Sequence, residues 1–589
     1  MAEFNGQRRY SRLQKLLSYL RPHWRITTFG ILALFIVNAV GTYLPLLISR
    51  AIDELQVTFS FAQVLHYVIL ILVLASVMWA IRMISRISLF GTGRQVEFDL
   101  KQQIFEHLLT LEPSYFATNT AGDLINRATS DVDNIRRLVG FAVLSLANTI
   151  FAYALTLPVM LSIDVGLSLA AIAVYPLILI LVQVFSDRLR NQQLAVQQAL
   201  SDMSELIQED MSGIALIKIY AQEANERREF RHLNQRLLAA NLILAKTRNI
   251  LFPILGGLAS ISLLVLLWFG SRAIANGAIT VGDFVALLLY IERLIFPTAL
   301  LGFTITAYQR GEVSIDRIEA ILTVEPTIQN PPTATSLPLE QVQGQLTARQ
   351  LTFTYPGAKT PALKDVSFEI QPGETVAVVG PVGSGKSTLA NALPRLLDIQ
   401  PGQLFLDGHD ITQLRLRDLR AAIAYVPQDS FLFSTSLRNN IRYGEPLREQ
   451  PEIEYVAKQA QIHDEILHFP RQYKTLVGER GITLSGGQRQ RTALARALLI
   501  DAAILVLDDS LSSVDNQTAT EILNTLSAGT QRKTVVFISH QLSAAATADR
   551  IFVMDRGEIV QMGTHAELLN QPGLYQSLWN EQKLEEILR

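Results

Sequence analysis

The chain has 589 residues, of which 49% are hydrophobic and only 18% are charged, with a formal net charge of -2 and no cysteine. This length exceeds what one hydrophobic core supports, and the apolar balance lies on the membrane side of the soluble average, so several domains are expected. The balanced charge argues against a nucleic-acid partner, because phosphate binding needs a basic face. The lack of cysteine excludes disulfides, thiol nucleophiles and cysteine-ligated metals.

Five segments contain no Asp, Glu, Lys or Arg and are long enough to cross a bilayer as helices, which takes about 20 residues. A sixth segment is weaker because Asp283, Glu292 and Arg293 interrupt it, but its uncharged parts lie end to end. We therefore expect an all-α transmembrane domain with six spans over residues 1–325. The spans are residues 26–49, 55–81, 138–163, 165–186, 249–271 and 281–308.

Basic residues flank the spans unevenly. The connections after the first, third and fifth spans hold only Arg50, no basic residue, and Arg272, respectively. The excess of positive charge before the first span predicts a cytoplasmic N-terminus. The first apolar segment is too long for a signal-peptide core, so we expect it to be retained. The basic residues before it are Arg8, Arg9, Arg12, Lys15, Arg21 and Arg25.

Two connections between spans are long, basic and helical in pattern, at residues 82–137 and 187–248. A helix that continues for about 25 residues beyond the bilayer reaches roughly 40 Å into the cytosol. Breaks at Pro113 and Gly213 make residues 115–123 and 212–218 the candidate tips of two helical hairpins. The alternative is that these connections are simply solvated loops with no partner.

The amino-acid composition of the chain changes after Glu325. Residues 327–338 read TIQNPPTATSLP, so residues 326–344 are predicted to be a linker. From about Gln345 onward strand and helix patterns alternate, which predicts an α/β domain over residues 345–589.

The pattern G-x-x-x-x-G-K-[ST] occurs at residues 380–388, which read GPVGSGKST between the predicted strand ETVAVV and a predicted helix. In such a loop the glycines let backbone N–H groups point at phosphates, the lysine reaches the β- and γ-phosphates, and the following serine ligates Mg²⁺. A purely structural glycine turn is the alternative. The phosphate interpretation assigns nucleotide binding to Gly380, Gly383, Ser384, Gly385, Lys386, Ser387 and Thr388.

Two adjacent carboxylates, Asp508 and Asp509, end the apolar run at residues 504–507. An acid at the end of a buried strand holds Mg²⁺ through water in P-loop NTPases generally. Two carboxylates side by side repel unless a cation or a proton lies with them, so an ion site is the simplest interpretation. The alternative is that one of them caps a helix that begins near Ser512.

A second phosphate-cradling sequence, LSGGQ, occupies residues 484–488 and is followed by the helical run RQRTALARALL. Its hydroxyl and backbone N–H groups would face a nucleotide at a helix start. One domain does not need two such cradles for one nucleotide, so we expect this one to serve the ATP of another domain. Its nucleotide-facing residues are Ser485, Gly486, Gly487 and Gln488.

With these motifs in this order, the chain resembles an ATP-binding cassette (ABC) exporter of the multidrug-resistance-like half-transporter type over essentially its whole length. The resemblance implies that an α/β P-loop NTPase domain binds ATP and Mg²⁺ and powers export by alternating access. It also implies a second half-transporter subunit, contact with membrane lipid, and a small amphipathic substrate such as a drug, lipid or peptide. We expect a multi-pass protein of the bacterial plasma (inner) membrane, with the nucleotide-binding domain cytoplasmic.

The resemblance adds roles for further residues. Tyr355 matches the aromatic residue that stacks on adenine, although in phase with Leu351 and Phe353 it would otherwise be assigned to the core. Gln428 matches the glutamine that contacts Mg²⁺ and the attacking water, although alone it would be a loop residue. His540 matches the histidine that contacts the γ-phosphate. Residues 512–515 match the loop that crosses the dimer interface, and residues 475–481 match the segment that meets the hairpin tips.

The family pattern has Glu where this chain has Asp509, and that Glu polarises the attacking water. Asp withdraws the carboxylate by about 1 Å or more, and misplacement on that scale costs on the order of 100-fold in rate. The resemblance is therefore to the slow-site subunit of heterodimeric exporters, and a heterodimer is favoured over a homodimer. The alternatives are a homodimeric lipid flippase, an importer, and an ATP-gated or regulatory membrane ATPase without vectorial transport. Catalytic roles are predicted for Asp509, His540, Gln428 and Lys386.

Glu292 and Arg293 stand out in the sixth span because ionisable groups at membrane depth are costly and often functional. Being adjacent on a helix, they point about 100° apart and cannot simply neutralise each other. Substrate contact or gating is one interpretation, and pairing with another helix is the other.

Overall fold

The computed structural model describes residues 14–57, 59–478, 481–527 and 533–588. Arg8, Arg9 and Arg12 of the N-terminal basic cluster and Glu479 and Arg480 of the segment at residues 475–481 lie outside these ranges. The chain forms two compact units. The first comprises Met1–Leu109 and Thr120–Val324, and the second comprises Thr110–Asn119 and Glu325–Arg589.

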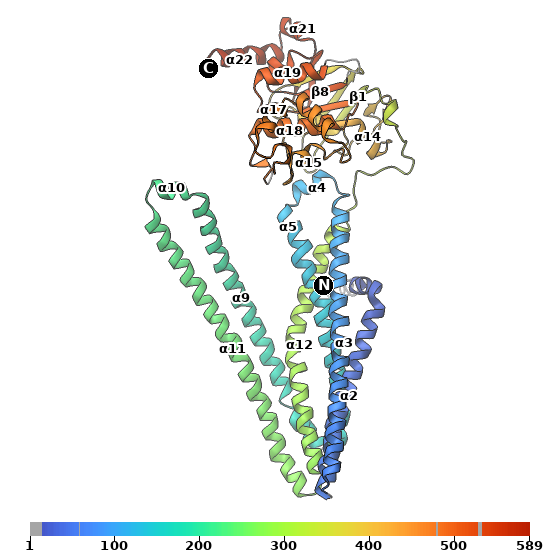
Figure 1. Cartoon of the computed structure of the whole chain (residues 1–589), viewed down its shortest axis with the longest axis vertical. Helices are drawn as coiled ribbons and strands as arrows, with labels where there is room; N and C mark the ends of the chain where they lie inside the picture. Colours follow the sequence, from blue (N-terminus) through green and yellow to red (C-terminus); the bar gives the residue numbers. More distant parts are fainter. Residues whose placement is uncertain (1–13, 58, 479–480, 528–532, 589) are drawn as a thin grey trace. The chain divides into compact units, whose positions relative to one another are not determined.

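The described part of the first unit is helical apart from short links, with 6 helices that are long and apolar enough to cross a membrane. This confirms the predicted six-helix transmembrane fold, including the weak sixth span. A 3-10 turn, η1 (Arg21–His23), precedes the first of them. The long helices are α2 (Trp24–Val57), α3 (Phe61–Leu108), α7 (Val143–Ile163), α8 (Val165–Ile172) with α9 (Tyr175–Ser212), α11 (Glu223–Ala275) and α12 (Val281–Leu322). The pairs α2 and α3, and α9 and α11, lie side by side (Figure 1).

The sixth span is a single helix because its first charged residue, Asp283, lies in the first helical turn, where a negative charge stabilises the helix. Asp283 forms a capping box at the start of α12, in which its carboxylate accepts the Thr280 N–H at 3.2 Å and the Thr280 hydroxyl accepts the Asp283 N–H at 3.0 Å. An acidic group in the first turn also interacts favourably with the helix dipole. The residue that appeared to interrupt the span is thus its start signal.

The fourth span, predicted at residues 165–186, lies within the candidate membrane span Val165–Ser212 but has a break that the sequence did not predict. Helix α8 ends at Ile172, and α9 begins at Tyr175 with a proline in its first turn. Proline has no N–H to continue the preceding helix, so the chain turns there and restarts. Asp164 begins α8 by accepting the Leu167 N–H at 2.7 Å.

Both long connections turn through short helices near the predicted tips. In the first, α4 (Pro113–Thr118) is followed by α5 (Ala121–Asn126), and in the second, α10 (Ile214–Ile219) links α9 to α11 (Figure 1). Thr120 separates α4 from α5 by accepting the Asp123 N–H at 3.4 Å. From Arg127 onward the chain alternates π-helix and α-helix up to α7, with η2 (Arg127–Asp131), α6 (Val132–Arg137) and η3 (Leu138–Ala142).

The second unit contains two sheets. The smaller is antiparallel, in the order β2-β1-β4-β5, and the larger has the order β10-β9-β3-β8-β7-β6, parallel except for β10. The strands are β1 (Leu346–Phe353), β2 (Leu363–Ile370), β3 (Thr375–Val379), β4 (Leu404–Leu406), β5 (His409–Asp410), β6 (Ile423–Val426), β7 (Ile504–Asp508), β8 (Thr534–Ile538), β9 (Arg550–Asp555) and β10 (Glu558–Gly563). The α/β fold of this part is as predicted.

Helices cover the larger sheet and separate its strands in the sequence, as parallel pairing requires. They are α13 (Lys386–Ala392), α14 (Leu416–Ala422), α15 (Leu437–Ile441), α16 (Gln450–Gln459), α17 (His463–His468), α18 (Gly486–Leu499), α19 (Asn516–Ser527), α20 (Leu542–Ala545), α21 (His565–Asn570) and α22 (Leu574–Leu588), with 3-10 turns η4 (Leu339–Gln341) and η5 (Gln472–Lys474).

The central strands β3, β7 and β8 are buried along their whole length. Alternate residues of β7 enter different apolar clusters, Leu505 and Leu507 on one face of the sheet and Ile504 and Val506 on the other. A sheet covered on both faces explains why these strands read as continuous apolar runs. The carboxyl ends of parallel strands meet at one edge, which brings the segments after β3, β7 and β8 together.

Candidate functional site

The loop between β3 and α13 requires its glycines. Gly380, Gly383 and Gly385 have φ angles of 148°, 81° and 100°, in the region that favours glycine. A Cβ on Gly380 would lie 2.1 Å from the Met554 carbonyl oxygen, and one on Gly385 would lie 2.5 Å from the Ala362 carbonyl oxygen. The alternative of a plain turn does not explain a loop held this closely against two other backbone segments.

Lys386, the first residue of α13, folds back under this loop. Its Nζ donates to the carbonyl oxygens of Gly380 and Pro381, both at 2.8 Å. Burial lowers the pKa of Lys386, and the nearby carboxylates of Asp509 and Asp508 oppose that change. The loop therefore has a fixed cation at its base, with backbone carbonyls as its partners in this structure.

Asp508 is the last residue of β7, so the strand runs one residue further than the apolar run suggests. Its carboxylate accepts a hydrogen bond from the Ser387 hydroxyl at 2.9 Å, and the Tyr425 hydroxyl lies 3.3 Å from its other oxygen. Burial raises the pKa of Asp508, and these two hydroxyls partly offset the change. A hydroxyl and a carboxylate in contact are oxygen ligands of the kind that Mg²⁺ uses together with substrate phosphates.

No group of three His, Cys, Asp or Glu side chains that could hold a metal ion by themselves occurs in the part of the chain that the structure describes. A metal at Ser387 and Asp508 would therefore need oxygen ligands from a bound nucleotide or from water, which is how Mg²⁺ is usually held.

Asp509 follows β7 in a left-handed conformation, with φ of 46°, and its side chain is 8% exposed. The helix predicted to begin near Ser512 begins instead at Asn516, where the Asp515 carboxylate accepts the Thr518 N–H at 2.9 Å. Asp515 is the capping residue, so the interpretation of Asp509 as a helix cap is wrong.

One pocket of about 380 Å³ collects most of the predicted residues. Its wall includes the loop from Gly383 to Thr388, both carboxylates at the end of β7, Gln428 after β6, His540 after β8, and Tyr355. Tyr355 lies beyond the end of β1, is 40% exposed, and has its hydroxyl 3.3 Å from the Thr388 hydroxyl. The interpretation of Tyr355 as a core residue is therefore wrong.

The LSGGQ sequence begins helix α18. Ser485 forms a capping box with Gln488, whose N–H donates to the serine hydroxyl at 3.2 Å and whose side-chain oxygen accepts the Ser485 N–H at 2.9 Å. A Cβ on Gly487 would lie 2.9 Å from the Ser513 carbonyl oxygen, so the glycine permits this close approach. None of residues 484–488, all of which the structure describes, lines the pocket.

Sequence reasoning missed two supporting residues. Tyr425 reaches Asp508 from β6, and Gln490 of α18 donates to the Ser512 hydroxyl at 3.1 Å and accepts the Ser513 N–H at 2.9 Å. Tyr425 lies in the same short motif as Gln428, so that motif was the available signal. Gln490 lies in a run that reads only as helix, and nothing in the sequence connects it with residues 512–513.

Comparison with known proteins agrees with this geometry. Residues 27–298 match the family described as ABC transporter transmembrane region, and residues 363–512 match the family described as ABC transporter. A Bacillus subtilis protein, "Probable multidrug resistance ABC transporter ATP-binding/permease protein YheI", is 32% identical over 98% of this chain and 98% of its own length. The chain belongs to the ABC exporter family.

Two other members of this ABC exporter family illustrate its range. An "ATP-dependent lipid A-core flippase" from Syntrophus aciditrophicus is 32% identical over 98% of the chain and 95% of its own length. A solved structure titled "Structure of a bacterial Atm1-family ABC exporter with ATP bound" superposes with a TM-score of 0.76 at 25% identity, covering 95% of this chain and 99% of that one.

Membership of this family establishes the location and the general activity of the protein. This ABC exporter is an integral membrane protein with an ATP-binding domain, and its ATP hydrolysis is coupled to transport. Exporters of this family function as dimers, and each chain that contains one transmembrane region and one ATP-binding domain is half of the transporter.

Proposed function

We propose that the chain is one half of a dimeric exporter that moves an amphipathic small molecule, lipid or peptide across the membrane, and that its own ATP site hydrolyses slowly. The observation that carries this proposal is the pocket shared by the phosphate loop, Asp508, Asp509 and Gln428, with the LSGGQ sequence lying outside it. Such a division suits a site completed by the second subunit, in which each chain's LSGGQ faces the other chain's nucleotide.

Within the pocket, the glycine loop and Lys386 would bind the phosphates of ATP, and Tyr355 would stack on the adenine. Ser387, Asp508 and Gln428 would hold Mg²⁺, which when bound supplies neutralisation of phosphate charge. Asp509 and His540 would orient the attacking water and the γ-phosphate. Ser485, Gly486, Gly487 and Gln488 would contact the nucleotide of the second subunit.

The slow site rests on the length of one side chain. A glutamate at position 509 would carry its carboxylate about 1 Å or more further into the pocket, and a positioning error of that size costs on the order of 100-fold in rate. The phosphate loop, LSGGQ and His540 carry the expected residues, so ATP binding and support of a partner's site are retained. We therefore favour a heterodimer in which the partner hydrolyses faster.

The transport cycle follows from the domain order. We propose that the transmembrane domain spans residues 1–325, the linker 326–344 and the nucleotide-binding domain 345–589, with the N-terminus and the nucleotide-binding domain cytoplasmic in a bacterial inner membrane. Closure of two nucleotide-binding domains on ATP would move the hairpin tips at α4 and α10. Tilting of the spans would then open a substrate cavity between them to the other side of the membrane, and hydrolysis would reset the transporter.

The test is the ATPase activity of the full chain, purified alone in lipid nanodiscs. We expect ATP to bind with ordinary affinity and to be hydrolysed slowly, and addition of a partner with Glu at the corresponding position should restore fast turnover. Lys386→Ala is the binding control and should lose ATP affinity. If the chain alone shows robust ATPase activity that vanishes in Asp509→Ala, the slow-site proposal is wrong.

One relative favours a second candidate function. The Syntrophus aciditrophicus relative is named as a lipid A-core flippase and matches nearly the whole chain, so a homodimeric lipid flippase is the main alternative. ATP-driven uptake into inverted vesicles by the chain alone would support it, whereas ATP-dependent conductance without uptake would indicate a gated or regulatory ATPase.

A further inference from the structure

A cavity of about 430 Å³ lies within the first unit among α2, α3, α7 and α12. Three arginines line it, Arg82 and Arg86 from α3 and Arg293 from α12, and no Asp or Glu is among its lining residues. Arg82 and Arg86 lie one turn apart at the end of the second predicted span. Arg293 stands about 18 Å into α12, near the middle of a membrane-spanning helix.

Arg293 is held by neutral groups. Its guanidinium donates to the backbone oxygen of Asn38 at 2.8 Å and to the Asn38 side-chain oxygen at 3.3 Å. A Cβ on Gly41 would lie 2.2 Å from Nη1 of Arg293, so that glycine makes room for the guanidinium against α2. Arg293 therefore contacts another helix, α2, as one of the two sequence-based interpretations expects, but this contact leaves its charge uncompensated.

The other two arginines lack counter-ions as well. Among the described residues no carboxylate pairs with Arg82, Arg86 or Arg293, and the nearest polar contact of Arg82 is the Met78 sulfur at 3.7 Å. Glu292, adjacent to Arg293, is exposed and does not line the cavity. Arg293 lies at membrane depth, where an uncompensated charge is costly unless an anion joins it. Arg82 and Arg86, exposed on α3, add two more positive charges to the same cavity.

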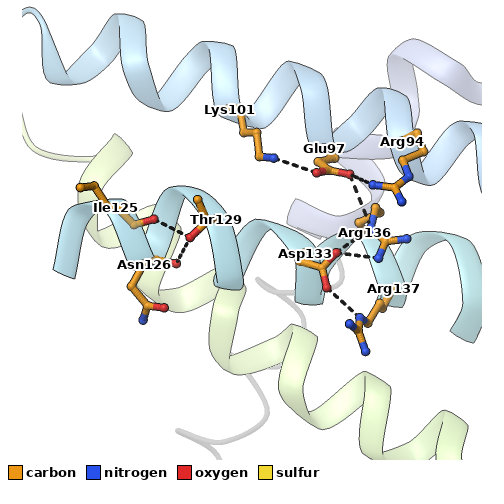
Figure 2. A network of polar contacts seen from close by, with 9 residues as sticks. All are labelled: Arg94, Glu97, Lys101, Ile125, Asn126, Thr129, Asp133, Arg136 and Arg137. Atoms are coloured by element: carbon orange, nitrogen blue, oxygen red, sulfur yellow. Dashed lines mark hydrogen bonds and ion pairs between the residues drawn. The ribbon is translucent and has the colours of Figure 1, made fainter. Parts of the chain in front are cut away.

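A second cavity, of about 500 Å³, is also lined by positively charged side chains. Five arginines line it, and again no carboxylate does. Three of them have acidic partners: Arg136 and Arg137 pair with Asp133 and Glu97, as Figure 2 shows, and Arg190 lies 4.0 Å from the Asp187 carboxylate. Arg248 and Arg310 pair with no acidic side chain in the described part of the chain. The arginines are Arg136, Arg137, Arg190, Arg248 and Arg310.

The first cavity is also apolar between its charged groups. Leucine, isoleucine and phenylalanine side chains form much of its wall, with the amides of Asn38 and Asn148 beside the arginines. An inorganic anion would leave that surface uncovered, whereas an acyl or aromatic tail would cover it. The chemistry that satisfies both parts is a negatively charged head group on an apolar body. The apolar residues include Leu34, Leu44, Ile48, Leu144, Phe296 and Leu300.

We propose that the transported molecule is an anionic amphiphile, with a phosphate, sulfate or carboxylate head group bound by Arg82, Arg86 and Arg293. This rests on the proposed export function and names its substrate class. Arg248 and Arg310 attract the same head group at the second cavity. Cationic amphiphiles are excluded by the same charges, because a fourth positive group among the three unpaired arginines would be repelled.

The test uses the full-length chain in neutral detergent and three fluorescent probes with the same tail. Their head groups are phosphate, phosphocholine and trimethylammonium, and inorganic phosphate is added as a competitor. We expect the phosphate-headed probe to bind at least about tenfold more tightly than the phosphocholine-headed probe. Displacement of the phosphate-headed probe by millimolar inorganic phosphate would show that the site binds a free anion and does not require an amphiphile. That result would overturn the proposal.

The variants separate binding from folding. Arg293→Gln and the double variant Arg82→Gln/Arg86→Gln should each weaken phosphate-probe binding about tenfold or more, whereas Arg293→Lys should retain part of it. Arg228→Gln is the matched control, because Arg228 is an exposed arginine of α11 that lines neither cavity, and it should change nothing. Because Arg82 and Arg86 are exposed, their replacement should leave the fold intact.

ATP binding is measured on the same samples. Equal affinity for all three head groups, or preference for trimethylammonium, with ATP binding intact would overturn the anionic class and leave the export function standing. Loss of ATP binding in the unmodified chain would instead contradict the export function itself.

Discussion

The side-chain nitrogen of Gln428 lies 3.5 Å from the Asp509 carboxylate, which connects the ends of two neighbouring strands, β6 and β7. Gln428 comes from the loop after β6 and Asp509 from the first position after β7. The two residues therefore form one wall of the nucleotide pocket. Because the Asp509 side chain is short, this contact holds its carboxylate near the strand ends. Lengthening the side chain by one methylene is therefore the most direct test of the site.

Asp509→Glu should raise the ATPase rate of the purified chain by roughly 10- to 100-fold, because one more methylene restores the reach of the carboxylate. The measurement is phosphate release at saturating ATP, with Asp509→Asn as the companion variant that should not gain activity. An unchanged or lower rate in Asp509→Glu would show that carboxylate length does not limit hydrolysis here.

Tyr355→Ala should weaken ATP binding by about tenfold, because stacking of a base on an aromatic ring contributes roughly 1–3 kcal/mol. Tyr355→Phe keeps the ring and loses only the weak contact with Thr388, so it should bind ATP nearly normally. Equilibrium binding of a fluorescent ATP analogue distinguishes the two. Equal loss in both variants would mean that the hydroxyl, and not the ring, carries the interaction.

Gly380→Ala should destabilise the protein by roughly 3 kcal/mol or more, because a Cβ there would meet the Met554 carbonyl oxygen at 2.1 Å in a backbone conformation that favours glycine. Gly357→Ala is the control, since its φ is 82° but no atom lies within 4 Å of the added Cβ. That variant should cost only about 1 kcal/mol. Apparent Tm values of the full chain test the difference, and similar losses in both variants would contradict the close contact.

Asp508→Asn should make the protein more stable near neutral pH, on the order of 1 kcal/mol, while abolishing turnover. Burial raises the pKa of Asp508, so folding favours its protonated form. The stability that this residue contributes is full below the ordinary aspartate pKa of about 3.9 and is lost as the pH rises through the folded-state pKa. The gain from Asn should therefore shrink toward acidic pH.

The apparent Tm of Asp508→Asn is compared with that of the unmodified chain at about pH 7 and at the lowest pH the protein tolerates. Asp365→Asn, at an exposed aspartate, is the control and should show no such pH dependence. A loss of stability in Asp508→Asn at neutral pH would mean that the hydrogen bonds from Ser387 and Tyr425 outweigh the cost of burying the charge.

The sequence predicted well what depends on neighbouring residues. Uncharged runs of about 20 residues must become helices in a bilayer, since no other structure satisfies their backbone there, so the six spans could be located. The phosphate loop could be placed between a strand and a helix because glycine and lysine at fixed spacing specify one local conformation. The two turns at Pro113 and Gly213 were close to where α4 and α10 lie.

The sequence-based predictions were wrong where the position of a residue depends on contact with a second segment of the chain. Tyr355 alternates with core residues in the sequence, but β1 ends at Phe353, and the tyrosine lines the pocket instead. Asp515 caps α19, because Ser513 first hydrogen-bonds to Gln490 of α18 and the helix begins only after that contact. Neither outcome could be read locally.

By itself the sequence predicted the order of the two family regions, the number of spans and a set of candidate nucleotide-binding residues, because each of these depends on short stretches of chain. Only the tertiary structure decided that Arg293 faces the same cavity as Arg82 and Arg86, which lie some 200 residues earlier in the chain, and that no acidic residue lines this cavity. The physical reason is that the charge balance of a cavity is a sum over helices brought together by packing, and no single helix carries that information.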